Sequence, residues 1–95
     1  MATVVYGDFE WDDGKAASNV AKHGVTFEEA AHALAGDPEA LDLADASDPS
    51  RLDTLAMSVL GRILYVVSTE TGPRLRIISA RRASAHERRI YADQA

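Results

Sequence analysis

The order of local patterns along the 95 residues predicts an α+β fold, with an antiparallel sheet, two N-terminal helices and a C-terminal helix (β-α-α-β-β-β-β-α). Three observations lead to this prediction. Apolar residues recur at helical spacing in two early segments. Three later segments alternate between apolar and polar residues or run apolar throughout, as strands do. A helix-capping pattern follows the last of these segments.

The first predicted elements are a strand and a helix. Residues 4–11 are rich in β-branched and aromatic side chains, which is typical of a strand. Asp12 or Asp13 is the expected N-cap of the following helix, because a short carboxylate accepts hydrogen bonds from the free N–H groups of the first turn. Gly24 is the expected end, since glycine readily takes the left-handed conformation after a helix.

A second helix is predicted to begin at Thr26, which starts a capping box. The Thr26 side chain would accept from the backbone N–H of Glu29, and the Glu29 carboxylate would reach back. Gly36-Asp37-Pro38 ends this helix, because proline cannot continue the hydrogen-bond ladder. Residues 41–43 then predict a short strand, and residues 46–50 an exposed loop.

Most of the sheet is expected in the second half of the chain. Residues 54–59 alternate, which indicates a half-buried strand, and residues 60–62 form a tight hairpin turn. Residues 63–67 are apolar on both faces and predict a central strand. A turn at 71–73 leads into the last strand, at 75–80.

Length and composition fit one small domain that spans residues 1–95. The chain has no cysteine, which excludes disulfides and thiolate metal sites and favours a reducing cytoplasm. No apolar stretch approaches the roughly 20 residues of a membrane span, and the N-terminus lacks the pattern of a secretory signal. We therefore expect a cytoplasmic protein without membrane contact.

Charge is divided unevenly between the two halves of the chain. Residues 1–50 hold eleven acidic and two basic residues, a net charge of −9. Residues 51–95 hold eight arginines and four acidic residues, a net charge of +4, and the whole chain has a net charge of −5. Arginine suits bidentate contacts with phosphate, so the second half indicates a surface for a polyanion. The alternative is that the arginines pair with the acidic half.

Lys22 and His23 stand at the expected end of the first helix. In one interpretation they only compensate the negative end of the helix dipole. In the other, the histidine takes a proton from a ribose 2′-hydroxyl, and the lysine stabilises charge that develops on a phosphate. The three histidines lack metal-ligand spacing, so we expect no metal site.

A second candidate site lies where the last strand meets the C-terminal helix. Alternation predicts that Ser79 and Arg81 share one face of the strand and that Arg76 lies on the other. A capping box at Ser84 to Glu87 begins the helix, and a strand end that meets a helix start favours phosphate. The alternative is an ordinary salt bridge between Glu87 and Arg81 or Arg88.

Several segments match, in order and spacing, those of one protein family. They are Phe9-Glu10-Trp11-Asp12, Lys15, Asn19, Lys22-His23-Gly24-Val25, Phe27-Glu28-Glu29-Ala30, Asp37-Pro38, Gly61-Arg62, Val66-Val67, Thr69, and Arg74 to Tyr91. Together they span nearly the whole chain, and Arg76 to Arg82 is among the most specific. On these segments the sequence resembles the BrnT family, toxins of bacterial type II toxin–antitoxin systems.

The resemblance implies a RelE-like fold and a metal-independent endoribonuclease that blocks translation without a cofactor. It implies a cognate BrnA-like antitoxin that holds the toxin inactive, in a dimer or a heterotetramer. The resemblance also implies that RNA is the substrate and that operator DNA is contacted only through this antitoxin.

Nine residues become candidates through this resemblance, eight on the matching segments and Arg51 at a further position where the family has an arginine. It implies catalytic roles for Lys22, His23, Arg51, Arg81 and Glu87, and RNA-binding roles for Arg74, Arg76, Arg88 and Tyr91. Among them, we expect Arg81 and Arg51 to stabilise phosphate and Lys22 to do the same or to position RNA. His23 or Glu87 would transfer protons. Arg89 is expected to face solvent.

Two other functions stay open. The family often has an acidic residue where this chain has Ser50, and an arginine shortly after Thr69, where this chain has Glu70-Thr71. These differences would fit a catalytically weak or inactive homologue that binds the antitoxin and assists repression. A direct DNA-binding protein is the other alternative, which the net charge of −5 and the lack of a helix-turn-helix or basic helix disfavour.

Overall fold

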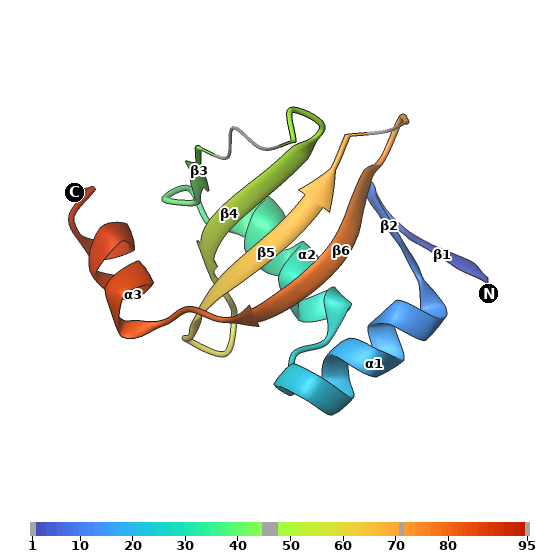
Figure 1. Ribbon diagram of the computed structural model, residues 1–95, viewed down its shortest axis with the longest axis horizontal. Coiled ribbons are helices and arrows are strands. Elements are labelled where there is room, and N and C mark those ends of the chain that lie inside the picture. The colour runs from blue at the N-terminus through green and yellow to red at the C-terminus, as the bar shows by residue number, and fades with distance from the viewer. Residues whose placement is uncertain (1, 45–47, 71, 95) are drawn as a thin grey trace.

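The computed structural model describes residues 2–44, 48–70 and 72–94, which form a mixed six-stranded sheet and three helices (Figure 1). The strands are β1 (Thr3–Tyr6), β2 (Phe9–Asp12), β3 (Leu41–Leu43), β4 (Arg51–Met57), β5 (Ile63–Thr69) and β6 (Leu75–Arg82). The helices are α1 (Asp13–His23), α2 (Phe27–Gly36) and α3 (Ala85–Ala92). The α+β prediction is confirmed. The predicted loop at 46–50 and turn at 71–73 include residues 46, 47 and 71, which lie outside the described residues.

The sheet differs from the prediction in its pairing and in the bounds of β4, which spans Arg51–Met57 rather than residues 54–59. The predicted first strand is a hairpin of β1 and β2, because Gly7, with a φ of 61°, turns the chain between them. The sheet is also not wholly antiparallel, since β2 runs parallel to β6 with Glu10 opposite Arg76. The strand order is β1-β2-β6-β5-β4-β3, so the last strand returns to the middle of the sheet. No helix within the described ranges is long and apolar enough to cross a membrane.

Both ends of α1 and the start of α3 follow the predicted capping residues. Asp12 accepts a hydrogen bond from the backbone N–H of Lys15 at 2.9 Å and begins α1. Gly24 ends α1 in the left-handed conformation, with a φ of 66°. Ser84 and Glu87 form the predicted reciprocal capping box of α3. These ends depend on near neighbours in sequence, which is why local patterns predict them.

The capping box predicted for α2 is wrong in its second half. Thr26 accepts from the backbone N–H of Glu29 at 3.0 Å, as expected. The Glu29 carboxylate, however, turns to Arg62 and forms two hydrogen bonds of 2.6 and 2.8 Å with its guanidinium. This contact lowers the pKa of Glu29. A bidentate ion pair is a stronger contact than one bond to a backbone N–H, so the tertiary partner replaces the local one.

The two N-terminal helices cover one face of the sheet and leave much of the other open. In Figure 1, α2 lies behind β4, β5 and β6, and α1 lies beside β6. The buried side chains of these elements form one core, in which Trp11 and Phe27 are the largest residues. Their rings meet edge to face, 5.8 Å apart. The opposite face of β4, β5 and β6 is called the open face below, and α3 lies at its β4 side.

α1 also covers the edge of β6 beyond the point where β2 ends. The buried amide of Asn19 donates to the carbonyl oxygens of Ala80 and Val25, at 2.7 and 2.9 Å. It also accepts from the backbone N–H of Ala80 at 3.1 Å. Asn19 therefore supplies the hydrogen bonds that a neighbouring strand would make and fixes α1 against the last residues of β6.

Candidate functional site

A β-bulge in β6 determines which arginines share the open face. Arg81 lies opposite Tyr65, and Arg76 lies opposite Thr69, so the six residues 76–81 of β6 face the five residues 65–69 of β5. The extra residue shifts the alternation by one position and puts Arg76 on the same face as Ser79 and Arg81. The prediction that Arg76 lies on the opposite face is therefore wrong, because simple alternation holds only in a strand without a bulge.

Arg81 and Glu87 meet on the open face, where β6 leads into α3. The two terminal nitrogens of Arg81 donate to the two carboxylate oxygens of Glu87, at 2.8 and 2.9 Å. The backbone N–H of Ser84 donates to the same carboxylate at 2.8 Å. The Arg81 guanidinium lowers the pKa of Glu87 to about 2, so this carboxylate is ionised at neutral pH. The Arg81 side chain remains 40% exposed, and its cation is therefore accessible.

Tyr65 and Asp53 connect this ion pair to Arg51. The guanidinium of Arg81 lies over the Tyr65 ring, 4.2 Å from the ring centroid. The Tyr65 hydroxyl donates to Asp53, which also accepts from Nε of Arg51 at 2.8 Å. Burial and the contact with Asp53 raise the pKa of Tyr65, so its hydroxyl remains a donor. Arg51, Asp53, Tyr65, Arg81 and Glu87 are called the Arg81 cluster below.

Asp53 and Tyr65 are not among the candidates that the sequence indicates. Asp53 stands two residues after Arg51, and in a strand this spacing places both side chains on one face. The spacing in the sequence could therefore have indicated Asp53 as a neighbour of Arg51. Tyr65 belongs to the apolar run at 63–67, where its side chain counts as apolar. A buried tyrosine hydroxyl needs a hydrogen-bond partner. This requirement could have indicated a polar contact at Tyr65.

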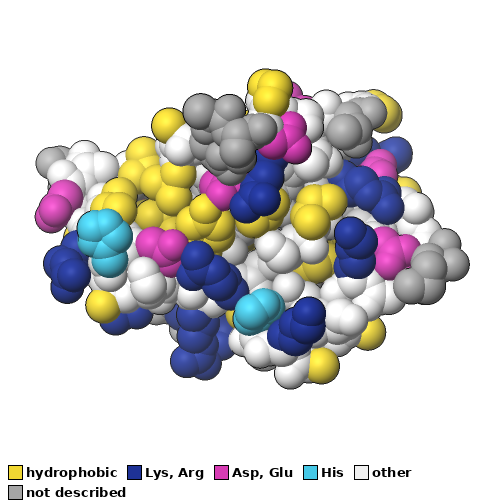
Figure 2. Space-filling model, viewed as in Figure 1, with side chains coloured by type: hydrophobic (Ala, Val, Ile, Leu, Met, Phe, Trp, Pro, Cys, Tyr) yellow, Lys and Arg dark blue, Asp and Glu magenta, His cyan; other side chains and the backbone are white. Residues whose placement is uncertain are grey.

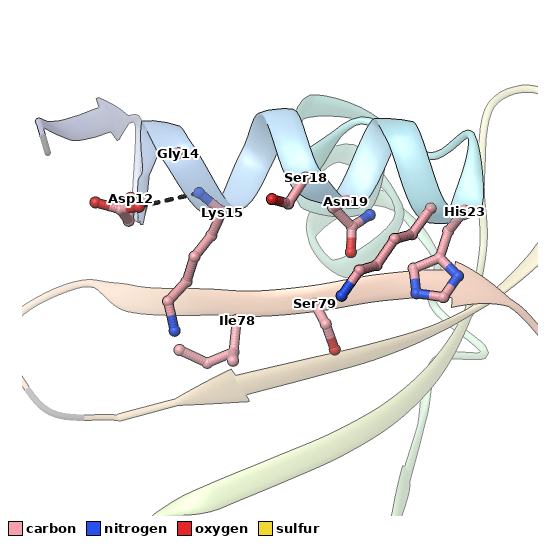
Figure 3. A pocket seen from close by; sticks show the side chains of 9 residues that line it. Asp12, Gly14, Lys15, Ser18, Asn19, His23, Ile78 and Ser79 are labelled. Atoms are coloured by element: carbon pink, nitrogen blue, oxygen red, sulfur yellow. Dashed lines mark hydrogen bonds between the residues drawn. The ribbon is translucent and has the colours of Figure 1, made fainter.

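The candidates Lys22 and His23 line a groove between α1 and β6 with a volume of about 580 Å³ (Figure 3). Lys15 and His23 extend from α1 toward β6, where Ser79 lines the other side. Ser79 precedes Arg81 by two residues on the same face of β6. The groove therefore opens beside the Arg81 cluster, and the two candidate sites of the sequence are neighbours in the fold.

Arg76 and Arg74 lie outside the Arg81 cluster. Arg76 donates to Glu10 at 2.5 Å, at the end of the open face away from α3. Arg74 precedes β6 and donates to the carbonyl oxygen of Gly7, in the turn between β1 and β2. Figure 2 shows that basic side chains, with acidic ones between them, occur from one end of the open face to the other, beside a hydrophobic area at the upper left.

Arg88 and Tyr91 use their polar groups to hold α3 in place. Arg88 donates to the carbonyl oxygen of Ala83 at 3.0 Å. The Tyr91 hydroxyl donates to Asp37, the residue that follows α2, at 2.7 Å. Burial and this contact raise the pKa of Tyr91 to about 12. Within the described parts of the chain, no group of three or more His, Cys, Asp or Glu residues is arranged to hold a metal ion.

The ion pair of Arg81 and Glu87 predicts a specific dependence of stability on pH. Because the pKa of Glu87 falls from 4.5 to about 2 on folding, its contribution is complete above about pH 4.5 and is lost as the pH falls through about 2. In Glu87→Gln, the free energy of unfolding should therefore decrease less than in wild type between these pH values. Urea denaturation at several pH values measures the difference. Equal decreases in both proteins would contradict the assignment.

The comparisons with known proteins agree with the resemblance seen in the sequence. A family model described as the ribonuclease toxin BrnT of type II toxin–antitoxin systems matches residues 11–87. The chain belongs to the BrnT family. Its matched region contains Lys22, His23 and the whole Arg81 cluster, so the open face lies within the BrnT part of the chain.

A solved BrnT structure is similar to this chain in both sequence and fold. The crystal structure of the ribonuclease toxin BrnT of Brucella abortus aligns with 28% identity and a TM-score of 0.64. The alignment covers 78% of this chain and 92% of that chain. None of the curated proteins compared matches the chain.

Proposed function

We propose that this BrnT-family chain is a metal-independent endoribonuclease that inhibits translation by cleaving RNA. One observation carries the proposal: the Arg81 cluster lies beside a groove lined by Lys22 and His23. Cations that can hold a phosphate therefore neighbour an imidazole that can move a proton, and this chemistry suits cleavage of RNA. Membership of a family of ribonuclease toxins supports the same conclusion.

The proposed reaction uses the ribose 2′-hydroxyl of RNA as its nucleophile. His23 takes the 2′ proton as the oxygen attacks the adjacent phosphorus. The bond from phosphorus to the 5′ oxygen breaks, and water protonates that oxygen. The products are a 2′,3′-cyclic phosphate and a 5′-hydroxyl. Arg81 and Arg51 stabilise the charge on the phosphate oxygens, and Lys22 assists them or positions the RNA.

Glu87 takes a positioning role in this scheme. A carboxylate with a pKa of about 2 is a weak base at neutral pH, which favours His23 for proton transfer. Glu87 instead holds the guanidinium of Arg81 in place over the Tyr65 ring. Arg76 lies on the same face and is proposed as a contact to RNA. The bonds that Arg74, Arg88 and Tyr91 make within the protein favour structural roles for these three residues.

The proposed partner is a cognate BrnA-like antitoxin. It would cover the basic open face and inactivate the toxin in the cytoplasm, in a dimer or a heterotetramer. Within this complex, only the antitoxin would contact operator DNA. The type II toxin–antitoxin description of the matching family supports an antitoxin partner. An antitoxin that covers the Arg81 cluster would exclude RNA from it directly.

Purified protein incubated with RNA in EDTA tests the proposed function. We expect cleavage that leaves 2′,3′-cyclic phosphate and 5′-hydroxyl ends, whereas DNA of the same sequence stays intact because it has no 2′-hydroxyl. Induction of the chain in a bacterial host should arrest growth, and co-expression of the neighbouring open reading frame should relieve the arrest.

Absence of both cleavage and growth arrest would contradict the nuclease proposal. If the chain still bound the antitoxin, this result would favour the alternative of an inactive homologue that assists repression. Cleavage that stops in EDTA and returns with a divalent cation would contradict the metal-independent mechanism alone.

A further inference from the structure

We infer that the groove between α1 and β6 is a binding track for the sugar–phosphate backbone of single-stranded RNA, next to the point of cleavage. The inference rests on the proposed nuclease function and adds Lys15 and Ser18 to the residues that contact the substrate. It assigns Lys15 and Ser18 to binding, separate from the chemistry at His23 and the Arg81 cluster.

The lysines of the groove differ in their ion pairing from the three arginines of the open face. Arg51, Arg76 and Arg81 each lie within 2.8 Å of a carboxylate oxygen. Among the residues that the structure describes, neither Lys15 nor Lys22 has a carboxylate within ion-pair distance. Both lysines are exposed and line the hollow. Their positive charge is therefore available to an anion from outside the chain.

The spacing of the groove residues suits an extended anion. Lys15 and Lys22 are seven residues apart in α1, which is about two turns and about 10 Å along one face of the helix. Ser18 lies between them, and Ser79 adds a hydroxyl from β6. From Ser79, Arg81 is two residues on, about 7 Å along the strand. An RNA backbone, which carries one negative charge per nucleotide, can therefore contact the groove and continue directly to the Arg81 cluster.

The lining of the groove favours the backbone of RNA over its bases. Its side chains come from Lys15, Ser18, Lys22, His23 and Ser79, with Asp12, Asn19 and Ile78. Asp12 already accepts the backbone N–H of Lys15 as the cap of α1. No phenylalanine, tyrosine or tryptophan lines the groove in the described part of the chain, so base stacking has no platform there. Binding should therefore depend on salt and depend little on base sequence.

Anisotropy of a fluorescent 2′-O-methyl oligonucleotide, which lacks the nucleophile and cannot be cleaved, tests the groove with the full chain. We expect Lys15→Gln to weaken binding severalfold at low salt. It should also reduce the slope of log K against log salt by about 0.7, the value for one lost phosphate contact on a single strand. Arg89→Gln is the matched control, because Arg89 is exposed on α3 and its substitution changes the net charge equally. It should leave affinity and slope unchanged.

A second measurement uses the unmodified chain and does not depend on the folding of a variant. Titration with the same oligonucleotide should shift the backbone NMR signals of residues 14–23 and 78–79. Equal binding by Lys15→Gln and Arg89→Gln, or no shifts in these segments, would overturn the inference. If Lys15→Gln bound polyglutamate more weakly than wild type but bound RNA equally well, the inference would also be overturned. The groove would then bind an acidic protein segment.

The cleavage assay on unmodified RNA separates this inference from the proposed function. If wild type cleaves RNA and Lys15→Gln and Arg89→Gln bind it equally, the inference about the groove is wrong and the nuclease proposal is unaffected. Binding that depends on Lys15, without any cleavage, would support the groove and contradict the nuclease proposal.

Discussion

Replacement of Arg81 by alanine should lower the rate of RNA cleavage by about 100-fold or more. Removal of one preorganised group that stabilises transition-state charge typically costs about 100- to 1,000-fold. Arg81 is held in place by Glu87 on one side and by the Tyr65 ring on the other, so its charge is already positioned before RNA binds. Single-turnover cleavage of a labelled RNA measures the effect.

Two further variants separate the role of Arg81 from a general loss of charge or fold. Arg81→Lys keeps the charge but loses the planar fork that pairs with Glu87, so we expect an intermediate rate. Arg89→Ala removes an exposed arginine of α3 and should retain the wild-type rate within about twofold, as distant surface changes usually do. Circular dichroism should show that each variant is folded. Equal cleavage by Arg81→Ala and wild type would remove Arg81 from the mechanism.

Replacement of Asn19 by alanine should cost about 3 kcal/mol of folding stability. The buried amide makes three hydrogen bonds to backbone groups, two of them to Ala80. Each buried group left without its partner costs about 1–3 kcal/mol, and these costs are not fully additive. The loss should occur although alanine favours a helix more than asparagine does. A domain of this size has about 5–14 kcal/mol in total, so the decrease should be large.

Urea denaturation of Asn19→Ala beside Ser18→Ala provides a matched comparison within α1. Ser18 is exposed, and its replacement should change the free energy of unfolding by no more than about 0.5 kcal/mol. Hydrogen exchange should also accelerate at the Ala80 amide, which loses its acceptor. A loss below about 1 kcal/mol in Asn19→Ala would mean that the edge of β6 does not depend on this side chain.

Local signals predicted most helix ends, fewer of the strand ends, and few of the contacts that form the site. The caps at Asp12, Gly24 and Ser84 were predictable because each depends on residues within about four positions. The pair of Arg81 and Glu87 was one of two alternatives left open by the sequence. The structure contains this pair, and it forms part of a cluster that also holds Asp53.

Three features of the fold had no local signature. The parallel pairing of β2 with β6 joins residues more than 60 positions apart. The bulge of β6 is visible only as a mismatch with the register of β5. The Glu29 carboxylate pairs with Arg62, 33 residues away, and not with the backbone N–H of Thr26 as the local capping pattern predicts. In each case the competing contact is distant in sequence, so no pattern within a short window can predict it.

The sequence by itself determined the helices, the strands of the second half, the excess of arginine there and the membership of the BrnT family. These follow from composition, short-range capping and ordered motifs. Only the tertiary structure decided that Arg76 shares a face with Arg81, that Tyr65 and Asp53 link Arg81 to Arg51, and that Lys22 and His23 open onto the same surface. The physical reason is that a side chain's face depends on strand register, and register is set by pairing with distant strands.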